Sequence, residues 1–412
     1  MSAPSTDLDL DRVDLTDLDL FADGPPYELF RRMRREMPVH WNEMDGEPGF
    51  WNITRFEDIR RISRDHETFS NERGGIFIQN EPGVPVDVQR QLMLGMDPPR
   101  HTKVRGIVQK VFSPRVVAER EPHIRQVVTR LIDDVIERGE CDFVSDIAVE
   151  LPLIVIAEML GVPVEDRYML FDWTNRASHA VATADPADTL QALAEMGQYL
   201  GALVAERRER PRDDLISRMV NAEVDGERLS DAEITISFGL LMFAGNDTTR
   251  NTASGAMLAL IEHPDQRQKL IEDPSLMRDA VEEFLRWVSA VLHFRRTATR
   301  DTEIAGQPIA AGDKVVMWYA SGNRDERAIP DPDRFDVTRP NVEHQAFGGG
   351  GRHFCLGNQL ARLELRVLFE ELLERIPDME LAGEPTRLRT NFTNELTSLP
   401  VAFTPGRPSD AG

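Results

Sequence analysis

The stretch Phe347-Gly-Gly-Gly-Gly-Arg-His-Phe-Cys-Leu-Gly357 decides how this chain folds and what it binds. Four consecutive glycines carry no side chains, so the backbone there can approach a flat, bulky group. Cys355 follows, and an amphipathic helical pattern begins near Asn358. The positive end of a helix dipole favours thiolate over thiol, and nearby backbone N–H groups can bond the sulfur. The stretch therefore predicts that Cys355 is the axial thiolate of a haem. The alternative is a free core cysteine after a flexible turn.

The bulk composition excludes several classes of protein. The chain has 412 residues and a formal net charge of −23, and such an acidic surface repels phosphate backbones, so nucleic acid is not an expected partner. Its two cysteines lie far apart in sequence, which argues against disulfides and for a reducing compartment. Cys141 is expected to be a small buried hydrophobe without a role. We find no signal-peptide pattern and no apolar run long enough for a membrane span, so a cytoplasmic location is expected.

The helical and strand patterns predict a mainly α fold with small β-sheets (α+β). Residues 1–26 are expected to form an acidic tail that lies on the body, and residues 27–412 a single domain. The Asp/Leu alternation from Asp7 to Leu20 leaves a strand as the alternative. Residues 72–96, rich in Gly and Pro, predict a long functional loop. Helices are expected at 27–37, 56–65, 100–110, 116–138, 146–160, 166–182, 187–208, 212–220, 264–272, 276–289 and 358–375, and strands near 40–54, 294–305, 313–318 and 398–403.

One long helix is the best-defined element of the sequence. Ser230 and Glu233 form a capping-box pattern, and the helical pattern continues to Glu262, before His263-Pro264. A helix of about 32 residues spans roughly 48 Å. Because this helix is apolar on most faces, it is expected to cross the interior of the protein.

A polar run, Ala-Gly-Asn-Asp-Thr-Thr-Arg-Asn at 244–251, interrupts this helix. Buried polar groups in such a place need a reason. Thr248 can bond back to a carbonyl of the preceding turn and distort the helix locally. Ala244 and Gly245 leave room for a ligand against the helix wall. A fourth pattern, Glu283-Phe-Leu-Arg286, places opposite charges at i and i+3 on one helix face.

Taken together, these motifs resemble the cytochromes P450 over nearly the whole chain. The resemblance implies the cytochrome P450 fold and a haem b cofactor (iron protoporphyrin IX), with Phe347, Gly357, Ala244 and Gly245 in contact with it. The family's usual cysteine loop has a phenylalanine seven positions before the ligand. Here that position is Gly348, so the loop is one residue longer. A loop of this length resembles the branch of actinobacterial cytochromes P450 that hydroxylate lipids and sterol side chains.

The resemblance assigns roles to further residues. Asp247 and Thr248 match the family's acid–alcohol pair, in which the hydroxyl holds the activated oxygen and the carboxylate relays protons. The alternative is a helix kink without proton transfer. His101, Arg105, Arg296 and His353 match the residues that bind the haem propionates. The pair Glu283–Arg286 is expected to be buried and to be completed by Arg334, in the stretch Pro-Asp-Pro-Asp-Arg-Phe.

The distal pocket is expected to be apolar and to take a lipid-like or terpenoid substrate. The residues expected to line it, besides the 72–96 loop and the 168–185 region, are Phe77, Phe243, Val291, Leu292 and Phe392. Related members of the family hydroxylate terminal or near-terminal C–H bonds of alkanes, methyl-branched lipids, isoprenoids or sterol side chains. We expect the same kind of reaction here. The alternatives are hydroxylation of a smaller terpene or polyketide, a peroxygenase or isomerase reaction, and haem binding without catalysis.

The resemblance also implies O2 as co-substrate and NAD(P)H-derived electrons delivered by a ferredoxin reductase and a ferredoxin. A basic patch on the cysteine side would suit an acidic ferredoxin, while scattered solvated charges are the alternative. The patch is expected to comprise Arg100, Lys103, Lys110, Arg352, Arg362 and Arg366.

Overall fold

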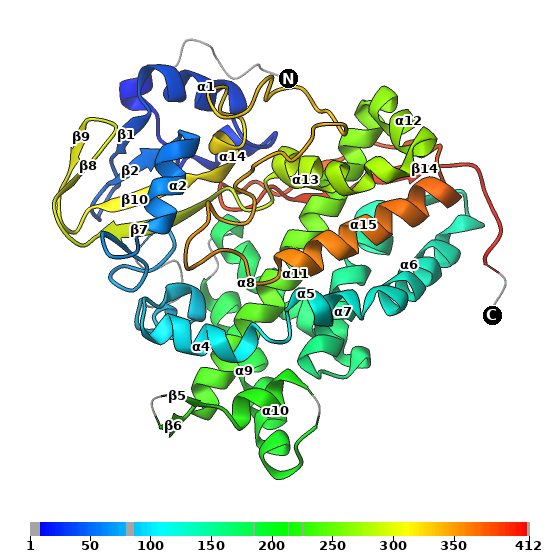
Figure 1. Ribbon diagram of the computed structural model, residues 1–412, viewed down its shortest axis with the longest axis horizontal. Coiled ribbons are helices and arrows are strands. Elements are labelled where there is room, and N and C mark those ends of the chain that lie inside the picture. The colour runs from blue at the N-terminus through cyan, green and yellow to red at the C-terminus, as the bar shows by residue number, and fades with distance from the viewer. Residues whose placement is uncertain (1–8, 80–85, 184–185, 213, 225, 410–412) are drawn as a thin grey trace.

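A computed structural model describes residues 9–79, 86–183, 186–212, 214–224 and 226–409. A helical body makes up most of the protein, and a sheet region lies at one side of it (Figure 1). The main sheet has the strand order β1-β2-β10-β7-β3. Its strands are β1 (Val39–Asn42), β2 (Phe50–Ile53), β3 (Phe69–Ser70), β7 (His293–Ala298) and β10 (Lys314–Trp318). β1 and β2 form the expected antiparallel hairpin, and β10 joins β2 in parallel.

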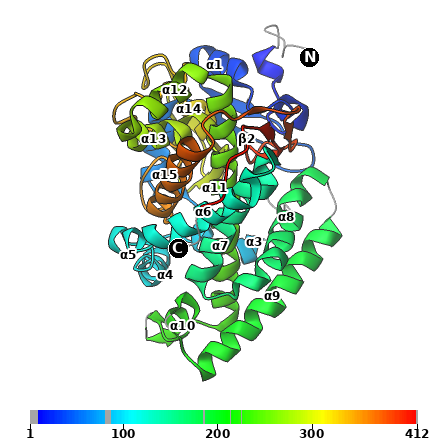
Figure 2. The same cartoon turned by 90° about the vertical axis from the view of Figure 1, so that its right-hand side faces the viewer.

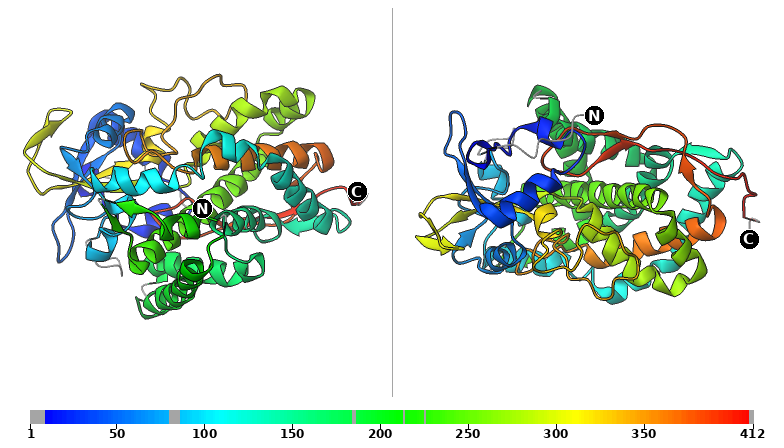
Figure 3. Two further views of the ribbon diagram at one scale, coloured as in Figure 1. Left: turned by 60° about the horizontal axis from the view of Figure 1, so that its bottom comes forward. Right: turned by 90° about the horizontal axis from the view of Figure 1, so that it is seen from above.

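The helical body is built around one central helix, α11 (Asp231–Glu262), which contacts α7, α9, α13 and α15. Figure 3 shows α11 running through the body from the sheet side, and Figure 2 shows α8 and α9 side by side. The helices are α1 (Tyr27–Glu36), α2 (Phe56–Arg64), α3 (Val86–Gln89), α4 (Arg100–Val108), α5 (Pro114–Ala118), α6 (Glu121–Ile136), α7 (Glu150–Leu160), α8 (Arg167–Thr183), α9 (Pro186–Glu209), α10 (Leu215–Val220), α12 (Pro264–Glu272), α13 (Met277–Val288), α14 (Tyr319–Gly322) and α15 (Asn358–Arg375).

Small two- and three-stranded sheets complete the fold. The remaining strands are β4 (Glu140–Asp142), β5 (Glu223–Val224), β6 (Glu227–Arg228), β8 (Thr302–Ile304), β9 (Gln307–Ile309), β11 (Glu380–Leu381), β12 (Thr386–Arg387), β13 (Leu396–Ser398) and β14 (Pro400–Ala402). The prediction of a mainly α fold with small sheets is confirmed. Part of the predicted 72–96 loop, residues 80–85, lies outside the described residues. Among the described residues, no helix is both long and apolar enough to cross a membrane.

The sequence correctly predicts where α11 begins and ends. The Ser230 side chain accepts the Glu233 N–H, and the Glu233 carboxylate accepts the Ser230 N–H at 2.9 Å, so the capping box is complete. The helix ends at Glu262, with His263 as its C-cap, and Pro264 starts α12. Thr248 bonds back to the Ala244 carbonyl at 2.8 Å, as expected, yet α11 continues as one helix through this turn.

One local prediction is wrong, and the strand left as the alternative for the N-terminal segment is absent from the described residues. The single helix expected at 116–138 is two helices, α5 and α6, because Pro122 has no N–H to donate to the Ala118 carbonyl and fits only in the first turn of a new helix. The Asp/Leu alternation near the N-terminus does not form a strand. It forms two 3-10 turns, Leu10–Arg12 and Leu18–Phe21, which the Asp9 and Asp17 side chains cap. The Phe21 ring stacks on Trp318 at 5.7 Å, so this acidic segment lies on the body.

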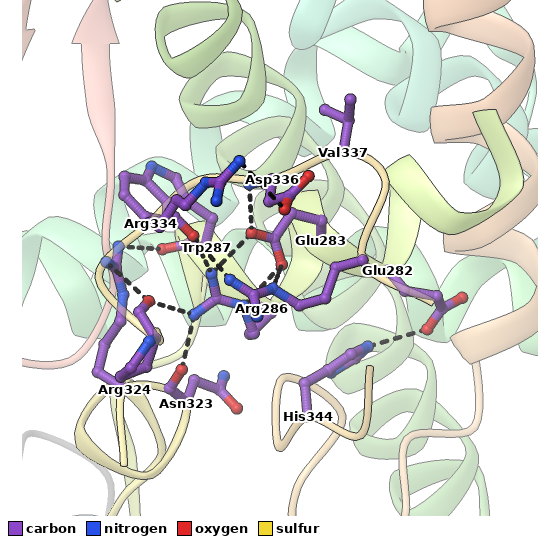
Figure 4. A network of polar contacts seen from close by, with 12 residues as sticks. Glu282, Glu283, Arg286, Trp287, Asn323, Arg324, Arg334, Asp336, Val337 and His344 are labelled. Carbon is purple, nitrogen blue, oxygen red and sulfur yellow. Dashed lines mark hydrogen bonds and ion pairs between the residues drawn. The ribbon is translucent and has the colours of Figure 1, made fainter. Parts of the chain in front are cut away.

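The Glu283–Arg286 pair is completely buried and bidentate, with both contacts at 2.7 Å (Figure 4). The remaining donors of Arg286 bond backbone carbonyls of Asn323 at 2.9 Å and Pro332 at 2.8 Å. Glu283 in turn accepts the Asp336 N–H at 2.9 Å. The pair therefore joins α13 to the irregular segment that leads into the cysteine loop.

Arg339, and not Arg334, places a second guanidinium beside Glu283. The Arg334 side chain is 62% exposed and reaches only Asp336, at 3.7 Å. Its neighbour Phe335 is buried in the core, so the Arg334 side chain points to solvent and only its carbonyl accepts from Arg286, at 3.3 Å. Arg339 is 13% exposed, and its Nε lies 3.4 Å from the Glu283 carboxylate. The sequence-based choice of Arg334 is wrong because spacing alone does not show which side chain turns inward.

This correction predicts different stabilities for two matched arginine variants. Arg339→Ala removes a cation from a buried carboxylate and should lower the free energy of unfolding by about 2–4 kcal/mol. Arg334→Ala should change it by no more than about 0.5 kcal/mol, because that side chain is solvated. Chemical denaturation of the two variants measures both values. Equal losses, or a larger loss for Arg334→Ala, would contradict the assignment.

Candidate active site

An internal cavity lies where α4, α11, the start of α15 and the cysteine loop meet. The centre of a water molecule can reach about 210 Å³ of it. Its walls are mostly apolar, and the polar side chains among them are concentrated in a few places. The lining residues that the sequence predicts as site residues are His101, Arg105, Ala244, Gly245, Thr248, Val291, Arg296, Phe347, His353, Cys355 and Gly357. Four segments that are far apart in sequence therefore meet at one cavity.

Cys355 lies in a tight turn at the start of α15, as predicted. Its N–H donates to the Phe347 carbonyl at 3.0 Å, and its own carbonyl accepts from Asn358 Nδ2 at 2.8 Å. Burial raises the pKa of the Cys355 thiol, although the Gly357 N–H and the charges of Arg105 and Arg362 oppose this. The helix terminus alone therefore does not ionise the thiol. A bound metal ion deprotonates such a ligand outright, so the position suits a metal-bound thiolate.

The four predicted propionate ligands come together on one side of the cavity. The rings of His101 and His353 lie 4.1 Å apart. Arg105 donates to the Phe354 carbonyl at 2.7 Å, and Arg296 donates to the Arg295 carbonyl at 2.8 Å. Glu364 is the only acidic residue among the described residues that line the cavity, and the Asp97 carboxylate acts on His101 and Arg296 from outside it.

Burial disfavours the charged form of all four groups. Burial, and then the charge of Arg105, lowers the pKa of His101 to about 4; burial and Arg296 lower that of His353 to about 2. Burial also lowers the pKa values of both arginines. His101 Nδ1 and His353 Nε2 are buried without a hydrogen-bond partner. A flat group that carries two carboxylates and a metal would satisfy these donors and the thiolate together, so the residues present fit haem.

Comparison with known proteins gives the family. The profile of the family Cytochrome P450 matches residues 18–382. The chain belongs to the cytochrome P450 family. It is therefore a haem-dependent monooxygenase that uses O2 and receives reductant-derived electrons from redox partners.

Three curated relatives and one solved structure resemble this P450 over most of their length. It is 40% identical to the methyl-branched lipid omega-hydroxylase of Mycobacterium tuberculosis, over 97% of this chain and 95% of that protein. It is 39% identical to the linalool 8-monooxygenase of Pseudomonas putida (96% and 100%) and 36% identical to the steroid C26-monooxygenase of Rhodococcus jostii (95% and 84%). A Mycobacterium marinum cytochrome P450 in complex with pseudoionone superposes with a TM-score of 0.90, at 39% identity (97% and 100%).

The two members of the predicted acid–alcohol pair of this P450 face different surroundings. Thr248 lines the cavity. Asp247 does not line it, and its carboxylate is almost fully buried, 3.3 Å from Asn246 Nδ2 and 3.6 Å from Arg250. Arg250 also pairs with Glu395 at 2.8 Å. The carboxylate thus belongs to a buried ion cluster beside the cavity.

Of the five residues expected to line the substrate pocket, one lines this cavity. Val291 lines the cavity, whereas Phe77, Phe243, Leu292 and Phe392 do not. Leu292 packs with Trp318 in the core under the N-terminal segment, because its neighbour Val291 takes the cavity side. Phe77 and Phe392 pack against each other at 5.4 Å and form a layer behind the wall. Phe243 is half-buried on α11. The apolar lining residues that the sequence did not indicate include Met93, Leu94, Ile156, Leu240, Leu241 and Phe294.

The four glycines of the cysteine loop serve a purpose that the sequence did not predict. All four have positive φ, from 58° to 95°. A Cβ on Gly349 would lie 2.4 Å from Ser63 Oγ, and one on Gly351 would lie 2.2 Å from the Ser63 carbonyl. Two of these glycines therefore allow the long loop to pack on the end of α2, while Gly348 lines the cavity.

The predicted basic patch is largely neutralised within the chain. Arg100 pairs with Glu233, Arg362 with Glu282, and Arg366 with Glu121. Lys110 and Arg352 are exposed. A ferredoxin would therefore meet ion pairs as well as free cations at this surface.

Glu364 and Tyr319 are two polar lining residues that the sequence analysis missed. Burial raises the pKa of Glu364 to about 8, against a hydrogen bond from Thr249. The Tyr319 hydroxyl is buried beside Arg296 and Ser63. Glu364 had a recognisable signal, because it stands in the apolar stripe of α15 between Leu360 and Leu368. Tyr319 follows an apolar strand and gave no such signal.

The raised pKa of Glu364 predicts a pH-dependent stability. The Glu364 carboxyl stays neutral in the folded protein but ionises in the unfolded chain. The free energy of unfolding therefore falls as pH rises from the pKa of Glu364 in the unfolded chain, 4.5, towards its pKa in the folded protein, about 8. Each pH unit in this window costs up to about 1.4 kcal/mol. The free energy of unfolding of the haem-loaded protein should therefore fall more steeply with pH than that of Glu364→Gln. Glu374→Gln, an exposed site on the same helix, is the control. Parallel pH profiles for wild type and Glu364→Gln would contradict the prediction.

Proposed function

We propose that Cys355 ligates the haem iron and that the enzyme inserts one atom of O2 into a C–H bond of an apolar, lipid-like substrate. One observation carries the proposal: the Cys355 thiol and the Thr248 hydroxyl face the same mostly apolar cavity from two different elements. Bound haem supplies the binding and reductive cleavage of O2, which a thiolate ligand favours. His101, Arg105, Arg296 and His353 would hold its two propionates.

Thr248 is the residue we propose to handle protons in the cavity. Its hydroxyl donates to the Ala244 carbonyl, so its lone pairs are free to hold a water molecule or accept a hydrogen bond. Cleavage of the O–O bond consumes two protons, which must reach a cavity walled mostly by apolar groups. We assign their supply to Asp247, whose neighbours Arg250 and Glu395 form a buried charged route beside α11. This reading favours an O2-dependent reaction over a peroxygenase reaction.

The substrate class rests on the cavity wall and on the relatives. Leu240, Leu241, Ile156, Val291 and Phe294 present only apolar surface. The relatives' names indicate a methyl-branched lipid, a steroid and linalool, all of them largely apolar molecules. We therefore propose hydroxylation of a fatty acid, methyl-branched lipid, terpenoid or sterol side chain. A smaller terpenoid is the second candidate, since linalool and pseudoionone are small.

Electron supply by a ferredoxin and its reductase is part of the proposal. Exposed Lys110 and Arg352 on an otherwise acidic chain suit an acidic partner. A cytoplasmic location fits such partners and remains a prediction.

A ligand titration tests the substrate class. Long-chain fatty acids, methyl-branched lipids, terpenes and sterols should displace water from the haem and shift its Soret band, because the cavity wall is apolar. The absorbance change in the haem-loaded protein gives the Kd for each ligand. The proposal fails if small polar ligands shift the band while no member of the four apolar classes does.

The role of Thr248 predicts uncoupled turnover in Thr248→Ala. NADH consumption should continue, while the amount of product formed per NADH should fall by roughly tenfold or more. The reason is that the hydroxyl that directs protons within the cavity is missing. Thr248→Ser keeps the hydroxyl and should restore most of the coupling. Product and NADH are measured together with a ferredoxin and its reductase. An unchanged product-to-NADH ratio in Thr248→Ala would exclude this role.

A further inference from the structure

Glu282, next to Glu283 on α13, is the centre of a separate polar cluster (Figure 4). Its carboxylate accepts two hydrogen bonds from Arg362, at 2.5 Å from Nε and 2.8 Å from Nη2. His344 Nε2 lies 3.0 Å from the same carboxylate. The Ala346 N–H donates to His344 Nδ1 at 3.2 Å, so the ring proton of a neutral His344 sits on Nε2 and points at Glu282. Glu282 thus joins α13, the loop before the cysteine and α15.

Arg362 carries this cluster to the cysteine turn. Its guanidinium carbon lies 4.5 Å from the centre of the Phe347 ring. Its Nη1 also donates to Asn358 Oδ1 at 2.9 Å, and Asn358 Nδ2 donates to the Cys355 carbonyl at 2.8 Å. The Phe347 carbonyl accepts the Cys355 N–H. Arg362 therefore touches both residues that hold the backbone of Cys355.

The charge of Arg362 lies close to the cysteine turn, because its guanidinium contacts both Asn358 and the Phe347 ring. Burial raises the pKa of Glu282, yet hydrogen bonds from His344 and Arg362 bring it to about 2. The carboxylate is therefore ionised at every working pH, and the Glu282–Arg362 pair is neutral as a whole. The two side chains are 21% and 28% exposed, so solvent screens the pair only in part.

We propose that Glu282 is a positioning residue that sets the reduction potential of the haem. It holds Arg362 against Phe347 and cancels most of the positive charge that Arg362 would otherwise direct at the Cys355 thiolate. Reduction adds a negative charge to the site, so an uncompensated cation favours the reduced form and an uncompensated anion disfavours it. The proposal rests on Cys355 as the haem ligand, which the preceding section assigns.

A set of charge variants tests this proposal by redox titration with a chemical reductant, without ferredoxin. Glu282→Gln keeps the shape of the side chain and leaves Arg362 uncompensated, so the reduction potential should become more positive. Arg362→Gln leaves Glu282 uncompensated, so the potential should become more negative. The double variant removes both charges and should return the potential towards the wild-type value. A purely structural pair would lower stability in all three without opposite shifts of the potential.

The ion pair of Arg366 with Glu121 is a control on the same helix, in which Arg366 is also paired with Glu370 at 3.1 Å. Arg366 stands one turn after Arg362 on α15, and its contact with Glu121 is 2.5 Å, like that of Arg362 with Glu282. None of the ring contacts of Phe347 involves Arg366. Glu121→Gln should therefore shift the potential much less than Glu282→Gln.

An unchanged potential in Glu282→Gln, or shifts of the same sign in the two single variants, would overturn the proposal. If Glu282→Gln does not retain haem, Arg362→Gln still decides, because the absence of a negative shift overturns it. Failure of the underlying assignment is distinguishable. Cys355→Ala should lose the red-shifted Soret band of the ferrous CO complex, whereas Glu282→Gln and Arg362→Gln should keep it.

Discussion

The buried, bidentate pair of Glu283 and Arg286 is the interaction on which the arrangement of the site depends. Both side chains are inaccessible to solvent. Arg286 also donates to, and Glu283 also accepts from, the backbone of the segment before the cysteine loop. Two ions in the core are costly unless every donor and acceptor is satisfied, so this geometry allows little movement. The next residue, Glu282, holds α15 through Arg362. Two adjacent carboxylates of α13 thus fix the two segments that flank Cys355.

The cavity itself is defined by an imbalance of charge. Two histidines and two arginines face it, and the pKa values of all four are lowered by burial. Glu364, the single lining carboxylate in the part of the chain that the structure describes, has a raised pKa. Burying these four basic side chains costs free energy when the cavity holds no anion. A ligand with two negative charges offsets this cost by accepting their hydrogen bonds. Haem binding is therefore coupled to the stability of the surrounding fold. The rest of the cavity wall is mostly apolar and offers a substrate few polar contacts. This agrees with the names of the relatives, which indicate different apolar molecules.

Much of the site could be predicted because its motifs are local. Cys355, Thr248 and the four propionate-side residues all line the cavity, since each belongs to a short pattern whose neighbours constrain it. The errors concern side-chain direction and long-range packing. Arg334 and Arg339 lie in the same irregular segment, and only the burial of Phe335 turns the first outward. Phe77 and Phe392 are as apolar as true lining residues, but they pack on each other behind the wall.

By itself, the sequence determined the helices, the cap and end of α11, and the cysteine turn, because these follow from short-range periodicity and hydrogen bonding. It also determined the chemical types that a haem requires. Only the tertiary structure decided which of two arginines joins Glu283, that Asp247 lies in a buried ion cluster, and that the extra-long glycine loop packs on α2. It also decided that Arg362 is paired with Glu282 and not free for a partner. These choices depend on contacts between segments far apart in the chain, whose relative orientation no local pattern encodes.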